Sequence, residues 1–363
     1  MRRSKRILAL AVSITTLSSC GRLRPEEAAT TPRGLVLAGQ RNVCGTRLRH
    51  RTFHIAAVHA QLDLGLGLKT ETWTYGGTLP GPVLEACEDD TVTIRMTNQD
   101  TDPVMGTGHG FDSHAFQIDA TKFEAVAPGQ TLEFSGRVEV PGVFMYHCAV
   151  GPATDWHIKT GMYGPMIVYP RKGLRDAKEI VVVQSAIYGE PDHFRNIVQN
   201  TGRTRANSPF LMMFNGKVEH EPVKVKAGEL VRVYFVNVGP GDSAVHVIGS
   251  ILERFYMSGN PRNIFYDSQT QSVPPGAGAM FEFRPPKGQS VLVDHDNLRF
   301  LEYGVAIEFD GESVLGLAEM LGRRRISHDE REFQPTSHPG RDSQIHRFQR
   351  LSPDWAKESE IHC

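Results

Sequence analysis

The sequence predicts an all-β protein built from two tandem copies of one β-sandwich. Between residues 50 and 310, alternating or β-branched segments are bounded by Gly, Pro, Asn and Asp, which is typical of short strands joined by turns. The two halves of this region repeat one another, and no helix-period stretch of convincing length interrupts them. The 35 Gly and 22 Pro residues suit the tight turns of such a fold.

The expected strands form two series. The first series comprises RTFHIAAVHA (51–60), LKTETWTY (68–75), TVTIRMTN (91–98), TLEFSGRVEV (131–140), GVFMYHC (142–148) and PMIVYP (165–170). The second series comprises EIVVVQSAIY (179–188), LVRVYFVNV (230–238), AVHVIGS (244–250), MFEFRPP (280–286), SVLVDH (290–295) and GVAIEF (304–309).

The repeat is clearest where a turn precedes a strand. The turn YGG and the strand DTVTIRMTN, within residues 75–98, match FNG and ELVRVYFVN, within residues 214–237, at a constant offset of 139 positions. A repeat of this length that consists of strands indicates two copies of one sandwich. We therefore expect one domain over residues 50–172 and a second over residues 173–310.

The two ends of the chain lie outside these predicted domains. Residues 1–20 join a basic start to an apolar stretch that is too short to span a bilayer, which indicates an export signal. The signal ends in LSSC, which resembles a bacterial lipobox and makes Cys20 the predicted lipidation site; a simple signal peptide with an incidental cysteine is the alternative. Residues 21–49 are expected to form a linker and residues 311–363 a polar extension. We expect an exported protein of the periplasm or cell envelope that meets a membrane only through a lipid anchor.

Charge and cysteine content narrow the function classes further. Lys and Arg total 40 against 41 Asp and Glu, so no basic surplus points to nucleic acid. Export makes disulfides permissible, and Cys44 and Cys87 are the natural pair. Two unpaired buried thiols are the alternative at these positions.

A run of soft metal ligands is the sharpest signal in the sequence. Cys148 is followed after eight residues by His157 and after four more by Met162. Thiolate, imidazole and thioether ligands together select copper, and this spacing is typical of the ligand loop of a blue-copper (type 1) site. Such a site also needs an upstream histidine from a neighbouring strand, and His109 fits that requirement.

Strand geometry predicts a second site beside the first. Successive side chains on a strand point to opposite faces, so if Cys148 faces into its domain, His147 points out of it. In the segment HGFDSH, His109 falls on one face, whereas Asp112 and His114 fall on the other. We therefore expect Asp112, His114 and His147 to converge on a second metal site; the alternative is that both histidines are ordinary surface residues.

The second repeat supplies a further imidazole. Its last hairpin ends at His295, which is followed by Asp296 rather than a cysteine and by no methionine at ligand spacing, so this half has no type 1 site. Three neutral imidazoles with an open fourth position make a catalytic site for copper or zinc. His246, on another strand of the same repeat, is either part of that site or a core histidine.

With these residues assembled, the chain resembles copper-containing nitrite reductases over about residues 50–310. The resemblance rests on the segments PGPVLEACEDD, H-x-x-D-x-H, GVFMYHCA, DWHIKTGMYGPMIVYPR, MFNGKV, HVIG and HDNLRFLEYG. It implies two tandem cupredoxin-like Greek-key domains and a homotrimer. It also implies one-electron reduction of nitrite to nitric oxide, with a small cupredoxin or cytochrome as the electron donor.

The resemblance assigns a role to each matching position, with one type 1 and one type 2 copper per subunit. The type 1 ligands would be His109, Cys148, His157 and Met162. The type 2 ligands would be His114, His147 and His295. Asp112 and His246 would relay protons, Ile248 would lie over the substrate, and Trp156 would mark the entry of electrons.

Two departures from the family pattern leave the substrate open. The sequence AFQIDA after His114 replaces a small, glycine-rich run, and Ile251 stands where these enzymes carry another histidine. Another two-domain oxidoreductase related to multicopper oxidases is therefore one alternative. Laccase chemistry itself would need His-x-His pairs, and the sequence contains none. The other alternative is a non-catalytic cupredoxin that carries electrons with type 1 copper alone.

Overall fold

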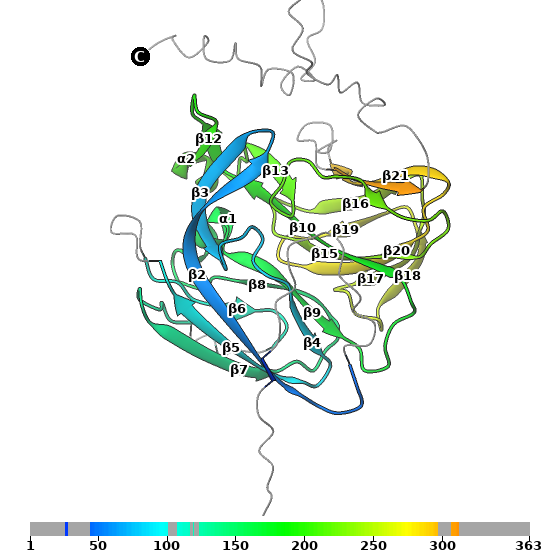
Figure 1. Ribbon diagram of the computed structural model, residues 1–363, viewed down its shortest axis with the longest axis horizontal. Coiled ribbons are helices and arrows are strands. Elements are labelled where there is room, and N and C mark those ends of the chain that lie inside the picture. The colour runs from blue at the N-terminus through cyan, green and yellow to red at the C-terminus, as the bar shows by residue number, and fades with distance from the viewer. Residues whose placement is uncertain are drawn as a thin grey trace, which may run out of the picture.

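The computed structural model describes residues 26–27, 44–100, 107–116, 119, 123–296 and 306–311. Within these residues nearly all regular structure is β-strand, so the all-β prediction is confirmed (Figure 1). The predicted signal with Cys20, most of the predicted linker and the predicted extension beyond residue 311 lie outside the described residues, and they stay predictions.

The first half of the chain contributes most of two sheets. One sheet has the order β11-β12-β3-β2-β5-β7, with β1 paired to β2, and the other has the order β4-β9-β8-β6. The strands of the first sheet are β1 (Glu26–Glu27), β2 (His50–Gly65), β3 (Leu68–Tyr75), β5 (Thr91–Asn98), β7 (Thr131–Arg137), β11 (Gly189–Pro191) and β12 (Asn196–Gln199). Those of the second are β4 (Leu84–Cys87), β6 (Asp112–Ser113), β8 (Gly142–His147) and β9 (Tyr163–Tyr169).

The second half builds another pair of sheets. Their orders are β13-β10-β15-β20-β17-β18 and β14-β22-β21-β16-β19. The strands of the six-stranded sheet are β10 (Lys178–Ile187), β13 (Leu211–Phe214), β15 (Val231–Asn237), β17 (Leu252–Met257), β18 (Ile264–Ser268) and β20 (Gly278–Phe283). Those of the five-stranded sheet are β14 (Val223–Lys224), β16 (Ser243–Ile248), β19 (Thr270–Val273), β21 (Gly288–Asp294) and β22 (Ala306–Gly311).

The repeat predicted from the sequence is visible in the strand pairing. In the first half β2 pairs parallel with β5, which pairs antiparallel with β7; in the second half β10, β15 and β20 pair in the same way. The order β4-β9-β8-β6 likewise corresponds to β14-β22-β21-β16. Strand β8 is therefore the counterpart of β21, and β6 is the counterpart of β16.

One segment crosses from the second half to the first. After β10 the chain forms the hairpin β11–β12, and β12 adds to β3 with Ile197 opposite Thr70. The short helix α2 (Thr201–Arg205) follows, and the Lys159 ammonium of α1 (Thr154–Thr160) donates to the carbonyl of Thr204 at 3.0 Å. None of the helices within the described residues has the length and apolar character needed to cross a membrane.

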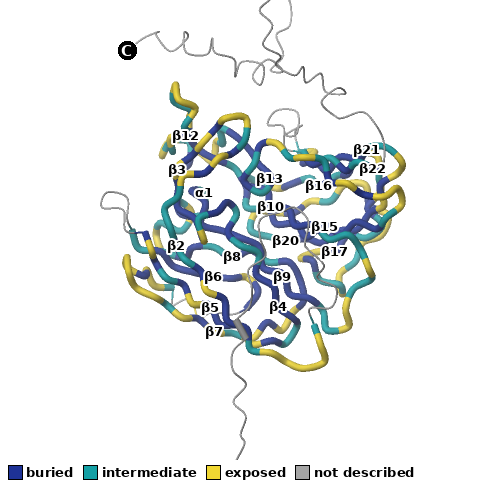
Figure 2. Tube along the Cα trace, viewed as in Figure 1, coloured by how far each residue is buried: buried dark blue, intermediate teal, exposed yellow. Residues whose placement is uncertain are grey.

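Each pair of sheets encloses a hydrophobic cluster, and a third cluster joins the two halves. Figure 2 shows buried residues along the strands of both halves. This third cluster includes Val143 of β8 together with Tyr256 and Met280 of the second half. The backbones approach closely here, because a Cβ atom on Gly278 would lie 2.1 Å from the Val143 carbonyl oxygen. Burial against the second half therefore fixes β8, the strand that leads to Cys148.

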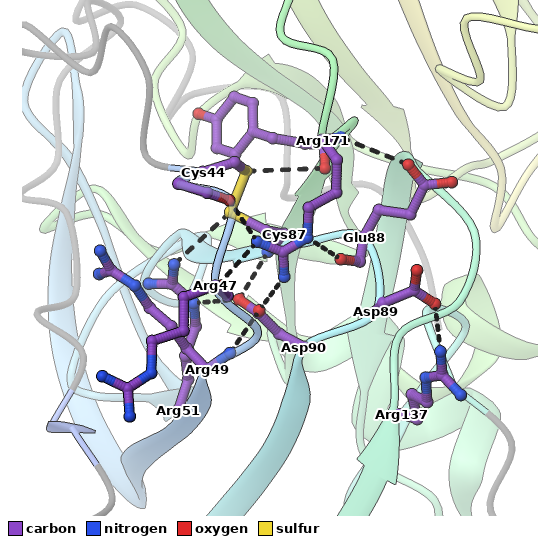
Figure 3. Close-up of polar contacts among 12 residues, drawn as sticks. Cys44, Arg47, Arg49, Arg51, Cys87, Glu88, Asp89, Asp90, Arg137 and Arg171 are labelled. Carbon is purple, nitrogen blue, oxygen red and sulfur yellow. Dashed lines mark hydrogen bonds and ion pairs between the residues drawn. A yellow bond between two sulfur atoms is a disulfide. The ribbon is translucent and has the colours of Figure 1, made fainter. Parts of the chain in front are cut away.

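The described segment that starts at residue 44 begins at a covalent cross-link. Cys44 and Cys87 form a disulfide, so the structure has the pair rather than two free thiols (Figure 3). The Arg171 guanidinium donates to the carbonyl oxygen of Glu88 at 2.7 Å (Figure 3). It also donates to the carbonyl oxygen of Gly45 at 2.8 Å. The disulfide and the arginine together hold the start of the described segment against the edge of the first sandwich.

Candidate metal centres

Three predicted type 1 ligands come together in the first sandwich. The ligand atoms of His109, Cys148 and His157 all lie within 4.8 Å of one another, and all three residues are buried. The distance from Cys148 Sγ to His157 Nδ1 is 3.3 Å, and the distance from His109 Nδ1 to His157 Nδ1 is also 3.3 Å. His109 precedes β6, His157 lies in α1, and Cys148 follows β8.

The backbone beside His157 brings Met162 into the same region. Gly161 ends α1 at a φ of 127°, and a Cβ atom there would lie 2.6 Å from the carbonyl oxygen of Trp73. Met162 is fully buried; its N–H donates to the carbonyl of His157 at 3.0 Å, and its carbonyl accepts the N–H of Cys148 at 3.0 Å. The glycine therefore allows the chain to turn from the helix back toward the cysteine.

Gly110 supports the sulfur and was not predicted from the sequence. Its N–H donates to Cys148 Sγ at 3.2 Å, and its carbonyl accepts the Tyr75 hydroxyl at 2.6 Å. A Cβ atom on Gly110 would lie 2.5 Å from the carbonyl oxygen of Ala149, so only glycine lets the two backbones approach this closely.

Burial controls the protonation of this site. It raises the pKa of the Cys148 thiol to about 12 and lowers the pKa of His157 to about 4. It also lowers the pKa of His109, an effect that the nearby Asp100 carboxylate partly opposes. In this environment a thiolate needs a neighbouring cation, and two neutral imidazoles with one sulfur form a ligand set suited to copper. The residues therefore fit the metal that the sequence predicted.

Two tryptophans border this candidate site. Trp73 of β3 packs on both histidines, with ring centroids 5.4 Å from His109 and 4.8 Å from His157. No sequence pattern singled out Trp73, although it is one of only three tryptophans in the chain. Trp156 of α1 is half-buried and packs against the cluster that contains Cys148 and Met162.

A second candidate site lies on the other side of the Cys148 backbone. The ligand atoms of Asp112, His114 and His147 also lie within 4.8 Å of one another. The two Nε2 atoms of His114 and His147 are 3.1 Å apart, and the distance from His147 Nε2 to an Asp112 carboxylate oxygen is 3.7 Å. Burial lowers the pKa of His147, so its imidazole tends to stay neutral and able to bind a metal.

Strand pairing positions this second group. Asp112 of β6 is opposite His147 of β8, which holds their side chains on the same face. His114 follows β6, and its Nδ1 lies 3.0 Å from the carbonyl oxygen of Gly276 in the second half of the chain. As predicted from the opposite faces of successive strand residues, the alternation of side chains divides these residues into two neighbouring groups.

The predicted residues of the second repeat form a separate pair. The rings of His246 and His295 lie 5.5 Å apart, on β16 and just after β21, and the N–H of His295 donates to the carbonyl of Ala244 at 2.8 Å. His295 is exposed, and Ile248 is half-buried. Among the described residues of the single chain, neither histidine joins the group of Asp112, His114 and His147. Ile251 is also exposed, at 47%.

Comparisons with known proteins agree with this arrangement. A family model described as multicopper oxidase matches residues 57–173. The chain is 35% identical over 258 residues to copper-containing nitrite reductases of Neisseria meningitidis and Neisseria gonorrhoeae, which covers 68% of this chain. The matched part spans slightly under two thirds of those relatives, at 66% and 64% of their lengths.

Solved structures extend the likeness to the whole of a related chain. The copper nitrite reductase from Nitrosomonas europaea is 31% identical with a TM-score of 0.66, over 74% of this chain and 98% of that one. The copper-containing nitrite reductase from Thermus scotoductus is 30% identical with a TM-score of 0.63, over 72% of this chain and 61% of that one. The fold is thus two tandem cupredoxin-like domains, and the chain belongs to the copper-containing nitrite reductase family within the multicopper oxidase superfamily.

Proposed function

We propose that the protein reduces nitrite to nitric oxide and water, with one electron and two protons consumed per nitrite. The observation that carries this proposal is the adjacency of the two candidate sites. Cys148 belongs to the buried group and His147, the preceding residue, belongs to the more exposed group. An electron accepted at the first site therefore has a short covalent path to the second.

In this proposal the first site is the electron-transfer centre. His109, Cys148, His157 and Met162 would hold type 1 copper. Their burial supports this role, because exclusion of water keeps the ligands neutral until a metal binds. Trp156 would lie where a small cupredoxin or cytochrome delivers the electron, since it is half-buried in the same helix as His157.

The second site would be the catalytic centre. His114 and His147, with His295 of a neighbouring subunit, would hold type 2 copper. When bound, copper supplies a one-electron redox couple and a Lewis acid with an open position for an anion. Asp112 and His246 would relay protons to the bound anion, since carboxyl and imidazole groups can act as general acids. Ile248 would limit the space above the anion.

The supply of His295 from another subunit requires an oligomer, which we propose to be a homotrimer. An exported location suits the disulfide between Cys44 and Cys87, since such bonds persist in oxidising compartments. Attachment through a lipid on Cys20, in the periplasm or cell envelope, completes the proposal.

Anaerobic turnover of nitrite with direct detection of nitric oxide tests the function. The copper-loaded protein should form one nitric oxide per electron consumed from a reduced donor, and the metal-free protein should form none. Preparations that hold only type 1 copper should accept electrons without forming nitric oxide. A fully metallated protein that consumes no nitrite would contradict the proposal and favour another small substrate.

A further inference from the structure

A buried carboxylate contacts the first candidate site at one ring nitrogen of His109. The Oδ2 atom of Asp100 lies 3.1 Å from Nε2 of His109, and both side chains are fully buried. The Nδ1 atom of the same imidazole faces His157 at 3.3 Å. The ring of His109 is thus held between a carboxylate and the proposed ligand group.

The surrounding backbone holds Asp100 in place. Its N–H donates to Asn98 Oδ1 at 2.9 Å, and its Oδ2 atom accepts the N–H of Thr107 at 3.2 Å. The side-chain amide of Asn98 donates to the carbonyl oxygens of Thr107 at 2.8 Å and Val126 at 2.7 Å. Val126 in turn pairs through its backbone with His109. The carboxylate and the histidine therefore belong to one fixed frame at the end of β5.

The charge of this carboxylate is only partly compensated. Its Oδ1 atom is buried and has no hydrogen-bond partner among the residues that the structure describes. A buried charge without a cation is costly, so its placement beside a ligand histidine calls for a nearby positive charge. A metal ion bound on the far side of the imidazole would provide that charge.

We infer that Asp100 is a positioning residue for the type 1 copper: it accepts the Nε2–H of His109, directs the Nδ1 lone pair to the metal, and favours the oxidised ion. The inference rests on the type 1 site of the proposed function, but not on nitrite as the substrate.

The physical reason is the asymmetry of a neutral imidazole. One ring nitrogen donates a hydrogen bond while the other accepts, and a carboxylate can only accept. Asp100 therefore fixes the proton on Nε2 and leaves Nδ1 free to bind a metal. Its negative charge interacts more strongly with Cu(II) than with Cu(I), and low dielectric surroundings strengthen that difference. The reduction potential should consequently lie lower than it would without the carboxylate.

Substitution of the carboxylate tests this role in the copper-loaded, full-length protein. Asp100→Asn removes the charge and keeps the shape, and Asp100→Ala removes the acceptor as well. We expect Cu(II) affinity to fall about 10–100-fold, the range for a lost partner of a ligand histidine, with a smaller loss of Cu(I) affinity. The reduction potential, measured by spectroelectrochemistry at the visible absorption band, should therefore rise in Asp100→Asn.

Asp90→Asn is the matched control. Asp90 is another fully buried carboxylate of the first sandwich, but it pairs with Arg51 at 2.7 Å and with Arg171 (Figure 3). This variant should lose thermal stability while the potential and the visible band stay as in the wild type. An equal loss of copper in folded Asp90→Asn and Asp100→Asn would overturn the inference, because general destabilisation would then explain both.

An unchanged reduction potential in copper-loaded Asp100→Asn would also overturn the inference.

A second test uses the wild-type protein, so its result does not depend on whether the variants fold. In the Cu(I) protein labelled with ¹⁵N-histidine, the Nε2 proton of His109 should exchange with water far more slowly than that of the exposed His54. Equally fast exchange would contradict the hydrogen bond. None of these measurements involves nitrite, so they remain informative if the substrate differs.

Discussion

At the scale of single residues, Cys148 separates the two candidate copper sites. Its sulfur is a potential ligand in the buried group. The other group takes its potential ligand atoms from Asp112, His114 and His147 and does not include Cys148. Cys148→Ala should therefore abolish the intense visible absorption of a copper–thiolate bond and leave a type 2 Cu(II) signal in electron paramagnetic resonance. A single spectral species in the fully metallated wild type would leave only the electron-carrier interpretation.

Asp112 and His246 should affect chemistry rather than metal content. Asp112→Asn and His246→Ala are expected to keep both coppers and to lower nitrite turnover by about 10²–10⁴-fold, the range for lost acid–base catalysis. Wild-type rates should fall as pH rises above neutrality, because two protons are consumed for each nitrite reduced. His54→Ala, at an exposed position of β2, is the control and should retain the wild-type rate. Full activity in both test variants, with chemistry limiting turnover, would exclude this proton relay.

The sequence could predict the residues of each group that are close in sequence or share strand parity. Cys148, His157 and Met162 form one local run, and alternation along a strand distinguished His147 from its neighbour. Trp73 and Asp100 could not be found in this way. Their contacts with His109 depend on how remote segments pack, and no periodic pattern encodes that.

At the scale of elements, the end of α1 sets the path between two proposed ligands. Gly161→Ala should cost about 1–3 kcal/mol of unfolding free energy for its strained φ, and more because the new methyl group would meet Trp73. The methyl group would push the turn at residue 161 away from Trp73. Because this turn lies between His157 and Met162, the visible band of type 1 copper should shift. Thermal or denaturant unfolding and visible absorption measure the two effects.

Gly228→Ala is the matched control for that substitution. Gly228 also has a positive φ, 75°, but a Cβ atom there would meet nothing within 4 Å. This variant should show the loss from backbone strain alone and leave the spectrum unchanged. Equal losses in both variants, with an unaltered visible band in Gly161→Ala, would show that α1 does not depend on this close contact.

Strands with clear alternation and flanking turns were predicted well. The observed bounds of β3 and β5 coincide with the predicted segments 68–75 and 91–98. The hairpin β11–β12 and the strands β17–β18 were not predicted, because their exposed or mixed residues give no clear period of two. The short helix α1 was missed too, since seven residues are too few for a helical period to stand out.

At the scale of the whole molecule, the two halves carry equivalent pairs at equivalent strands. In the first half His114 follows β6, with its N–H donating to the carbonyl of Met145, two residues before His147 at the end of β8; in the second half His246 is opposite Val293, two residues before His295. His246 lies on β16 and His295 follows β21, the counterparts of β6 and β8 in the second half. A heterologous contact between the first half of one subunit and the second half of the next would bring the pairs face to face, and it can close into a ring.

Subunit mixing tests whether such a ring completes the type 2 site. His114→Ala and His295→Ala should each lack type 2 copper and nitrite turnover, while type 1 copper and its colour persist because those ligands lie within one sandwich. When the two variants are unfolded together and reassembled, some interfaces join an intact His114 to an intact His295, so part of the type 2 signal and activity should return. Mixtures assembled from separately refolded, non-exchanging variants serve as the control and should stay inactive. Well-mixed oligomers that recover neither copper nor activity would mean that His295 acts within its own chain, and a monomer that retains both coppers would refute the shared site.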